Sequence, residues 1–197
     1  MSAPEHHRLF IAIRIPEQIK HAMAAAQSEL RQALPERVVT WTKREQLHLT
    51  LKFLGNVDVK CLDALNEQLR AACQGFAPLT LRAERIGVFP DARLPRVVWA
   101  GLTDVEGQLL KVQSAVETAS KNSTALEPEK RFTGHVTLAR AKRINRSDSQ
   151  VLSGLLADMA DRLFGEWTAG EIELMRSALG ADGARHTSIT TAHLSGS

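Results

Sequence analysis

A four-residue pattern, His-x-Thr-Leu, occurs twice in this 197-residue chain and constrains its fold more than any other feature. The two copies begin at His48 and His135. Each lies in a run with strand-like alternation, 46–54 for the first copy and 132–140 for the second. Composition alone gives two such copies a chance on the order of 1 in 500. The repeat therefore indicates two similar half-structures, each built around one copy.

Both copies are typical of a β-strand with one apolar face. Successive side chains of a strand point to opposite faces, so residues two apart share a face. His48 and Thr50 therefore point one way while the leucines between and beside them point into a core. His135 and Thr137 repeat this arrangement against Val136 and Leu138. We expect the same polar pair to be presented by two different strands.

Two histidines that face each other across a cleft can act as a general acid and a general base on the two sides of one reacting centre. Displacement at phosphorus is such a reaction, because it needs a water activated on one side of phosphorus and a leaving oxygen protonated on the other. Imidazole can do either, because its pKa lies near neutrality. The hydroxyls of Thr50 and Thr137 can donate to the non-bridging oxygens as negative charge builds there. The two-fold repeat leaves open which histidine is the acid.

Further stretches beside the two motifs match a known family. They are Arg8-Leu9-Phe10-Ile11-Ala12-Ile13, Trp41, Gly87-Val88-Phe89-Pro90 and Pro95-Arg96-Val97-Val98-Trp99. On these residues and the two motifs, the sequence resembles the two-histidine phosphoesterase superfamily, and within it the RNA 2′,3′-cyclic phosphodiesterases, also called 2′-5′ RNA ligases. The resemblance spans about 8–194. One position departs from the family pattern: Gly134 stands where a proline usually precedes the second histidine, which loosens the backbone there.

The resemblance implies a fold, an activity and roles for individual residues. The fold is α+β and bilobal, with two antiparallel sheets, helices on their outer faces, a pseudo-two-fold axis and an active-site cleft between the lobes. The activity is metal-independent opening of an RNA-terminal 2′,3′-cyclic phosphate to a 2′-phosphomonoester. His48 is the implied proton donor, His135 the proton acceptor and Arg140 a phosphate ligand. Because Arg140 has the strand parity of Leu138, we expect it at or beyond the strand end, where it can turn inward.

Three aromatic residues are candidates for stacking an RNA base, namely Trp41, Phe53 and Phe132. Packing into the core is the competing interpretation for each of them. His186 and His193 lack a motif context, and we expect both on the surface.

Local patterns predict the other elements. Strands are expected over about 8–15, 38–41, 78–89, 96–102, 168–179 and 185–194, and helices over about 16–34, 58–73, 103–121 and 147–163, with a turn at 55–56 that ends the first motif strand. The order of elements repeats roughly once, with one histidine motif in each half. The whole chain, 1–197, is therefore interpreted as one bilobal domain.

The composition limits the kinds of partner that this protein is expected to bind. A net charge of +3 suits an RNA end or a small anion better than a long duplex. The expected substrates are RNA 3′ ends with a 2′,3′-cyclic phosphate, including tRNA fragments, or small cyclic nucleotides. Since no ligand cluster is evident and the strained cyclic phosphate is reactive, no metal or cofactor is expected. Without a signal peptide or an apolar run of 18 residues, we expect a cytoplasmic protein without membrane contact and, by default, a monomer.

Other functions stay open at this level. The same acid and base would catalyse the reverse reaction, 2′-5′ joining of tRNA halves. A non-catalytic module that binds a nucleotide or an RNA end is a further alternative, although such a module would not need both histidines. An ATP-dependent ligase is disfavoured, because the sequence has no glycine-rich phosphate-binding loop.

Overall fold

In the part of the chain that the structure describes, alternating apolar residues build nine β-strands, and helical apolar stripes build four α-helices. The computed structural model describes residues 5–34, 36, 38–127, 131–142, 144–180 and 183–196. The strands are β1 (His6–Arg14), β2 (Val39–Trp41), β3 (His48–Asp58), β4 (Leu79–Phe89), β5 (Val97–Asp104), β6 (His135–Ala141), β7 (Leu163–Ala169), β8 (Glu171–Gly180) and β9 (Gly183–His193). The helices are α1 (Glu17–Ala33), α2 (Leu62–Cys73), α3 (Leu109–Ser120) and α4 (Arg146–Asp158), with 3₁₀ turns η1 (Arg44–Gln46), η2 (Val59–Cys61) and η3 (Lys121–Ser123).

The strands form one antiparallel sheet in the order β7-β4-β5-β6-β3-β1-β8-β9, with β2 paired to β6. We call β3-β1-β8-β9 the first half-sheet and β7-β4-β5-β6 with β2 the second half-sheet. Within the described residues the ladder between the halves contains one pair, Leu49 with Val136. The prediction of two separate sheets is therefore wrong, because the two motif strands hydrogen-bond to each other where the halves meet.

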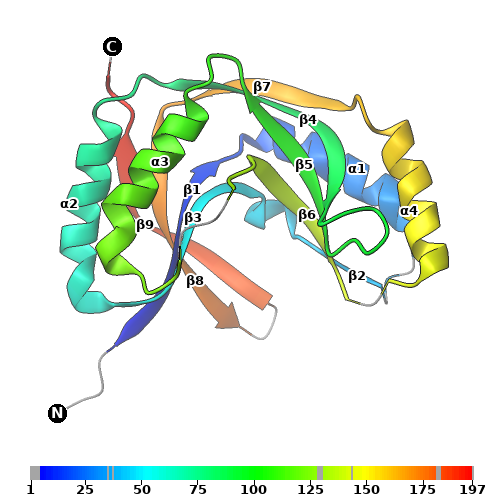
Figure 1. Ribbon diagram of the computed structural model, residues 1–197, viewed down its shortest axis with the longest axis horizontal. Helices are drawn as coiled ribbons and strands as arrows, with labels where there is room; N and C mark the ends of the chain where they lie inside the picture. The colour runs from blue at the N-terminus through cyan, green and yellow to red at the C-terminus, as the bar shows by residue number, and fades with distance from the viewer. Residues whose placement is uncertain are drawn as a thin grey trace.

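The helices cross over between the halves (Figure 1). Helix α1 lies between β1 of the first half-sheet and β2 of the second half-sheet in the sequence, and it packs against β7 and α4 of the second half. Helix α3 lies between β5 and β6, yet it packs against β3 and α2 of the first half. Helix α3 therefore covers the half to which neither of its flanking strands belongs, whereas α1 connects β1 of the first half-sheet to β2 of the second half-sheet.

The apolar faces of both motif strands are completely buried. Leu49 and Val136 are 0% exposed, and Leu51 and Leu138 are 2% and 0% exposed. The core continues under the amphipathic helices, where Met23 of α1 and Leu65 and Leu69 of α2 are also fully buried. Burial of one such side chain stabilises the fold by roughly 1.5–3 kcal/mol. The polar faces of β3 and β6 are thus presented from a rigid base.

Several predicted boundaries are wrong, among them the start of the third helix, which begins at Leu109 and not near Thr103. Strand β3 does not turn at 55–56, because Gly55 takes a φ of +71° within the pairing to β1 and the strand runs on to Asp58. Helix α4 is capped by Asn145 in a capping box with Asp148, and it ends at Asp158. The residues after it form β7, which the sequence pattern did not predict and which the pairing to β4 stabilises. None of the helices among the described residues has the length and apolar character needed to cross a membrane.

Candidate active site

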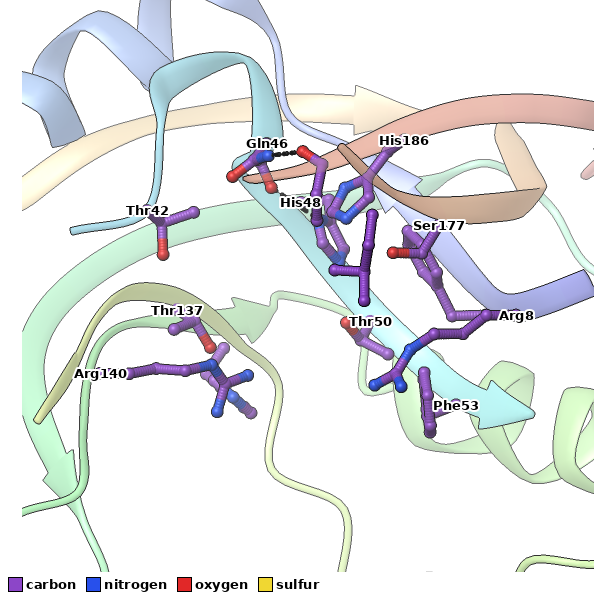
Figure 2. Close-up of a pocket in the computed structure, with 14 residues that line it drawn as sticks. Arg8, Thr42, Gln46, His48, Thr50, Phe53, Thr137, Arg140, Ser177 and His186 are labelled. Atoms are coloured by element: carbon purple, nitrogen blue, oxygen red, sulfur yellow. Dashed lines mark hydrogen bonds between the residues drawn. The ribbon is translucent and has the colours of Figure 1, made fainter. Parts of the chain in front are cut away.

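The two His-x-Thr motifs meet at the junction of the half-sheets. Since Leu49 pairs with Val136 in an antiparallel register, His48 lies opposite Thr137 and His135 lies opposite Thr50. All four side chains are half-buried and line one cavity of about 370 Å³ (Figure 2). The structure thus brings together the four residues that the sequence placed at the site.

A β-bulge follows the threonine in each motif. Leu51 of β3 is skipped in the pairing with β1, and Leu138 of β6 is skipped in the pairing with β5. Each bulge shifts the alternation by one residue, so that Phe53 and Arg140 join the histidine face. Both side chains line the cavity. The expectation that Arg140 turns inward at the strand end is wrong, because the bulge turns it while the strand continues to Ala141.

Both imidazole rings are held through the same nitrogen. Nδ1 of His48 lies 2.6 Å from the carbonyl oxygen of Gln46, and Nδ1 of His135 lies 2.8 Å from that of Thr133. Because a carbonyl oxygen only accepts, Nδ1 carries the proton and donates it in both rings. Nε2 of each histidine is then the nitrogen left to exchange a proton with a bound molecule.

His48 packs against two rings of the first half-sheet that also contact each other. Its ring centroid lies 4.8 Å from that of Phe10 on β1 and 5.2 Å from that of His186 on β9. His186 also lies edge-on to Phe10 at 4.9 Å and lines the cavity. The surface prediction for His186 is therefore wrong. No local pattern marks this residue, because its place depends on the order β3-β1-β8-β9. His193 is exposed as predicted.

His135 is supported by a stack of aromatic rings on the second half-sheet. Its ring lies edge-on to Phe89 of β4 at 5.1 Å, and Phe89 lies 5.0 Å from Trp99 of β5. Trp99 in turn lies over Gly87, where a Cβ atom would approach the indole ring to 2.3 Å. The Gly87-Val88-Phe89 stretch therefore has a physical role: the glycine admits the tryptophan that packs against Phe89.

Burial controls the charge of the histidines on the first half-sheet. Desolvation lowers the pKa of His48 to about 4, and the hydrogen bond to the Gln46 carbonyl opposes this shift only in part. Desolvation also lowers the pKa of His186. His48 is therefore neutral near pH 7 in the unliganded protein. A bound anion would favour its charged form.

Two arginines reach the cavity from opposite halves. Arg140 comes from β6 and Arg8 from β1, and both side chains are exposed at its edge. In the part of the chain that the structure describes, neither guanidinium has an ion pair or a hydrogen bond. The sequence identified Arg140 through the family resemblance but gave no role to Arg8.

Two of the three predicted stacking residues lie outside the cavity. Trp41 packs against the core under the Arg31 guanidinium, whose Cζ lies 5.3 Å above the ring. Phe132 precedes β6, packs against the core and lines a separate depression beside Leu109. Their positions favour the core interpretation. Phe53 alone of the three lines the cavity.

Gly134 adopts an ordinary backbone conformation with close neighbours. A Cβ atom at this position would lie 3.1 Å from both the Leu102 carbonyl oxygen and the Leu109 side chain. Its own carbonyl accepts from the Leu102 backbone N–H at 3.0 Å, so His135 enters the strand in register without a proline. Among the described residues, no group of three or more His, Cys, Asp or Glu side chains has the arrangement of a metal site.

Comparison with known proteins agrees with this geometry. Residues 13–99 match the family model described as LigT like phosphoesterase. The RNA 2′,3′-cyclic phosphodiesterase of Methanocaldococcus jannaschii is 30% identical over 177 residues, which cover 89% of this chain and 94% of the relative.

Solved structures share the fold over nearly the full chain. TT0787 of Thermus thermophilus has a TM-score of 0.76 at 27% identity, covering 96% of this chain and 98% of that one. E. coli LigT complexed with 3′-AMP has a TM-score of 0.74 at 23% identity, covering 96% and 99% of the two chains. With both histidine motifs in one cavity and a relative matched over almost its whole length, this chain belongs to the RNA 2′,3′-cyclic phosphodiesterase family of LigT-like phosphoesterases.

Proposed function

We propose that this protein opens 2′,3′-cyclic phosphates at RNA ends to 2′-phosphates, with His48 and His135 as general acid and general base. The observation that carries this proposal is the pairing of the two motifs across one cavity, with each Nδ1 bound to a backbone carbonyl. Each Nε2 is then free for proton transfer. A module that only binds nucleotides would not need two rings held in this matched way.

The reaction uses both nitrogens in one displacement. Nε2 of His135 takes a proton from water as the water oxygen attacks phosphorus. The bond from phosphorus to the ribose 3′ oxygen breaks, and Nε2 of His48 gives its proton to that oxygen. The product keeps the phosphate on the 2′ oxygen. His135 has gained one proton from the water, and the new 3′ hydroxyl has received one proton from His48. Assignment of His48 as the acid follows the family resemblance.

Three further side chains stabilise the transition state in this proposal. Thr50 and Thr137 donate from the two motifs to the non-bridging oxygens, and Arg140 places its guanidinium beside them. The negative charge of the phosphate also favours protonation of His48, whose burial otherwise keeps it neutral. Binding of the anionic substrate thus prepares the acid.

The two half-sheets act as two lobes of one catalytic domain in this view. The cavity takes residues from β1, β3, β8 and β9 on one side and from β6 on the other. The substrates proposed are RNA 3′ ends that carry a cyclic phosphate, tRNA fragments among them, with small cyclic nucleotides as minimal forms. The cavity volume of about 370 Å³ suits one nucleotide, and a longer chain would extend over the rim.

The test is turnover of a dinucleotide that ends in a 2′,3′-cyclic phosphate, measured in EDTA with the position of the product phosphate determined. The wild type should give a 2′-phosphate, and His48→Ala and His135→Ala should each lose on the order of a hundredfold or more in kcat. His193→Ala serves as the matched control, since this histidine is exposed and lies outside the cavity. An inactive wild type that still binds nucleotide would favour the binding module, and loss of activity in EDTA would contradict the metal-independent mechanism.

A further inference from the structure

We propose that Arg8 binds the phosphodiester on the 5′ oxygen of the terminal nucleoside, so that the enzyme prefers an RNA end to a mononucleoside cyclic phosphate. This inference rests on the proposed function and adds a second phosphate site to it. The site is the Arg8 guanidinium with the Phe53 ring beneath it, at the mouth of the cavity.

Arg8 is fixed in place by an aromatic ring of the first motif strand. Its Cζ atom lies 4.8 Å from the centroid of Phe53. The bulge at Leu51 turns Phe53 to the face of His48 and Thr50, so the guanidinium is held relative to the catalytic residues. A cation–π contact of this kind limits the freedom of a long side chain. Less conformational entropy is then lost when an anion binds.

Among the described residues, no carboxylate forms an ion pair with Arg8. Some other arginines are paired with a carboxylate, as Arg14 is with Glu173 and Arg162 with Glu29, at 2.5 Å and 2.7 Å. Within the described residues, Arg8 has no ion pair and no hydrogen bond, although its side chain is exposed and lines the cavity. A planar guanidinium with free donors is suited to a phosphate group.

Arg8 and Arg140 line different parts of the cavity. Figure 2 shows Arg140 and Arg8 on opposite sides of Thr50, with Arg8 beside Phe53. Arg8 precedes Phe10 by two residues on β1, so the two share a face, and Phe10 contacts His48. If His48 protonates the leaving 3′ oxygen, the ribose lies on this side of phosphorus. The 5′ oxygen of the same ribose then carries the next phosphate toward the mouth, where Arg8 stands.

The decisive readout is a ratio between substrates. We would compare kcat/KM for a dinucleotide with a terminal cyclic phosphate, for the mononucleoside cyclic phosphate, and for that mononucleoside with an added 5′-phosphate. Arg8→Ala should lower the ratio of dinucleotide to mononucleoside about 10- to 100-fold, the range for a lost charge-assisted hydrogen bond. The 5′-phosphorylated mononucleoside should respond as the dinucleotide does. Arg8→Lys keeps the charge but not the planar guanidinium, and its ratio should lie between those of the wild type and Arg8→Ala.

Arg176→Ala is the matched control. Arg176 is an exposed arginine of β8 in register with Leu9 and lies outside the cavity, so its loss removes the same charge nearby and should leave the ratio unchanged. An equal loss on all substrates, or none, would overturn the inference. A response confined to the dinucleotide would mean that Arg8 contacts the second nucleoside rather than a phosphate, which also overturns it.

A binding measurement keeps this test separate from the proposed function. The affinities of a nucleoside 2′-phosphate and a dinucleotide 2′-phosphate can be compared in wild type and Arg8→Ala. If no substrate turns over but Arg8→Ala still removes the preference for the dinucleotide, the proposed hydrolysis fails and the second phosphate site stands. If hydrolysis is observed and the preference for the dinucleotide does not depend on Arg8, the proposed hydrolysis stands and the second phosphate site is contradicted.

Discussion

The two histidine motifs have the same sequence pattern, and each is followed by a β-bulge, but they lie in different surroundings. His48 is enclosed by Phe10 and by His186 of the β8–β9 hairpin. The hairpin is tied to the motif because the Gln46 side chain donates a hydrogen bond to the Ala184 carbonyl. His135 has Phe89 at its edge, and its Nδ1 hydrogen bond is exposed to solvent.

This difference shows how a symmetric motif can serve an asymmetric reaction. Burial disfavours the charged form of His48, so its protonation depends on a bound anion. That dependence suits an acid which should act only when a phosphate is present. The more open position of His135 suits a base that must accept a water molecule. In the proposed mechanism the acid therefore depends on the bound substrate for its charge, while the order of the two roles rests on the family resemblance.

The largest effect would come from a substrate whose leaving 3′ oxygen is replaced by sulfur. A thiolate leaves without protonation, since thiol pKa values lie near 8.5, so the acid is no longer needed. The loss caused by His48→Ala should shrink from about a hundredfold or more to less than about tenfold, while His135→Ala keeps its full loss. Rates for both variants on the oxygen and sulfur substrates measure this. The opposite pattern would show that the roles are exchanged.

The next largest effect is on the pH dependence of the free energy of unfolding, and it tests whether His48 is buried and neutral. An unfolded histidine takes up a proton near pH 6.5, whereas folded His48 does so only near pH 4. Protonation in this window favours the unfolded chain, so stability is lost as the pH falls from about 6.5 to about 4. Between pH 7.5 and pH 4.5, wild type should lose roughly 2–3 kcal/mol more of its free energy of unfolding than His48→Asn does. Urea unfolding at the two pH values measures it, and equal losses in both proteins would refute the claim of a buried, neutral His48.

The smallest effect is expected at His186, the residue that encloses His48. His186→Ala should admit water to the His48 ring and so raise the pKa of His48 toward its usual range, with a loss of activity of roughly threefold to tenfold. His186→Phe should restore the packing, the lowered pKa and most of the activity. Titration of labelled histidines by NMR follows the His48 pKa directly. If His186→Phe behaves as His186→Ala does, the ring acts through its nitrogens and not through packing.

The central pair of motifs was predictable because it depends on local geometry. A strand places residues two apart on one face, so His48 with Thr50 and His135 with Thr137 follow from spacing alone. The apolar residues on the opposite faces of these strands follow from the same alternation and lie in the core as expected. Chemistry then follows from residue type, since two imidazoles beside two hydroxyls suit proton transfer at a phosphate.

The tertiary structure decided everything that depends on strand pairing. The bulges at Leu51 and Leu138 arise in the pairing with β1 and β5, so no local rule could turn Phe53 and Arg140 inward. The same holds for His186, because β9 is not adjacent to β3 in the sheet and the contact between the two imidazole rings depends on the tertiary arrangement.

The sequence by itself therefore determined the reacting groups and the faces that carry them, because alternation along a strand is a property of the chain. The tertiary structure decided which further side chains reach the cavity, how deeply each histidine is buried and that the two halves share one sheet. These features depend on contacts between segments distant in the sequence, and only folding fixes such contacts.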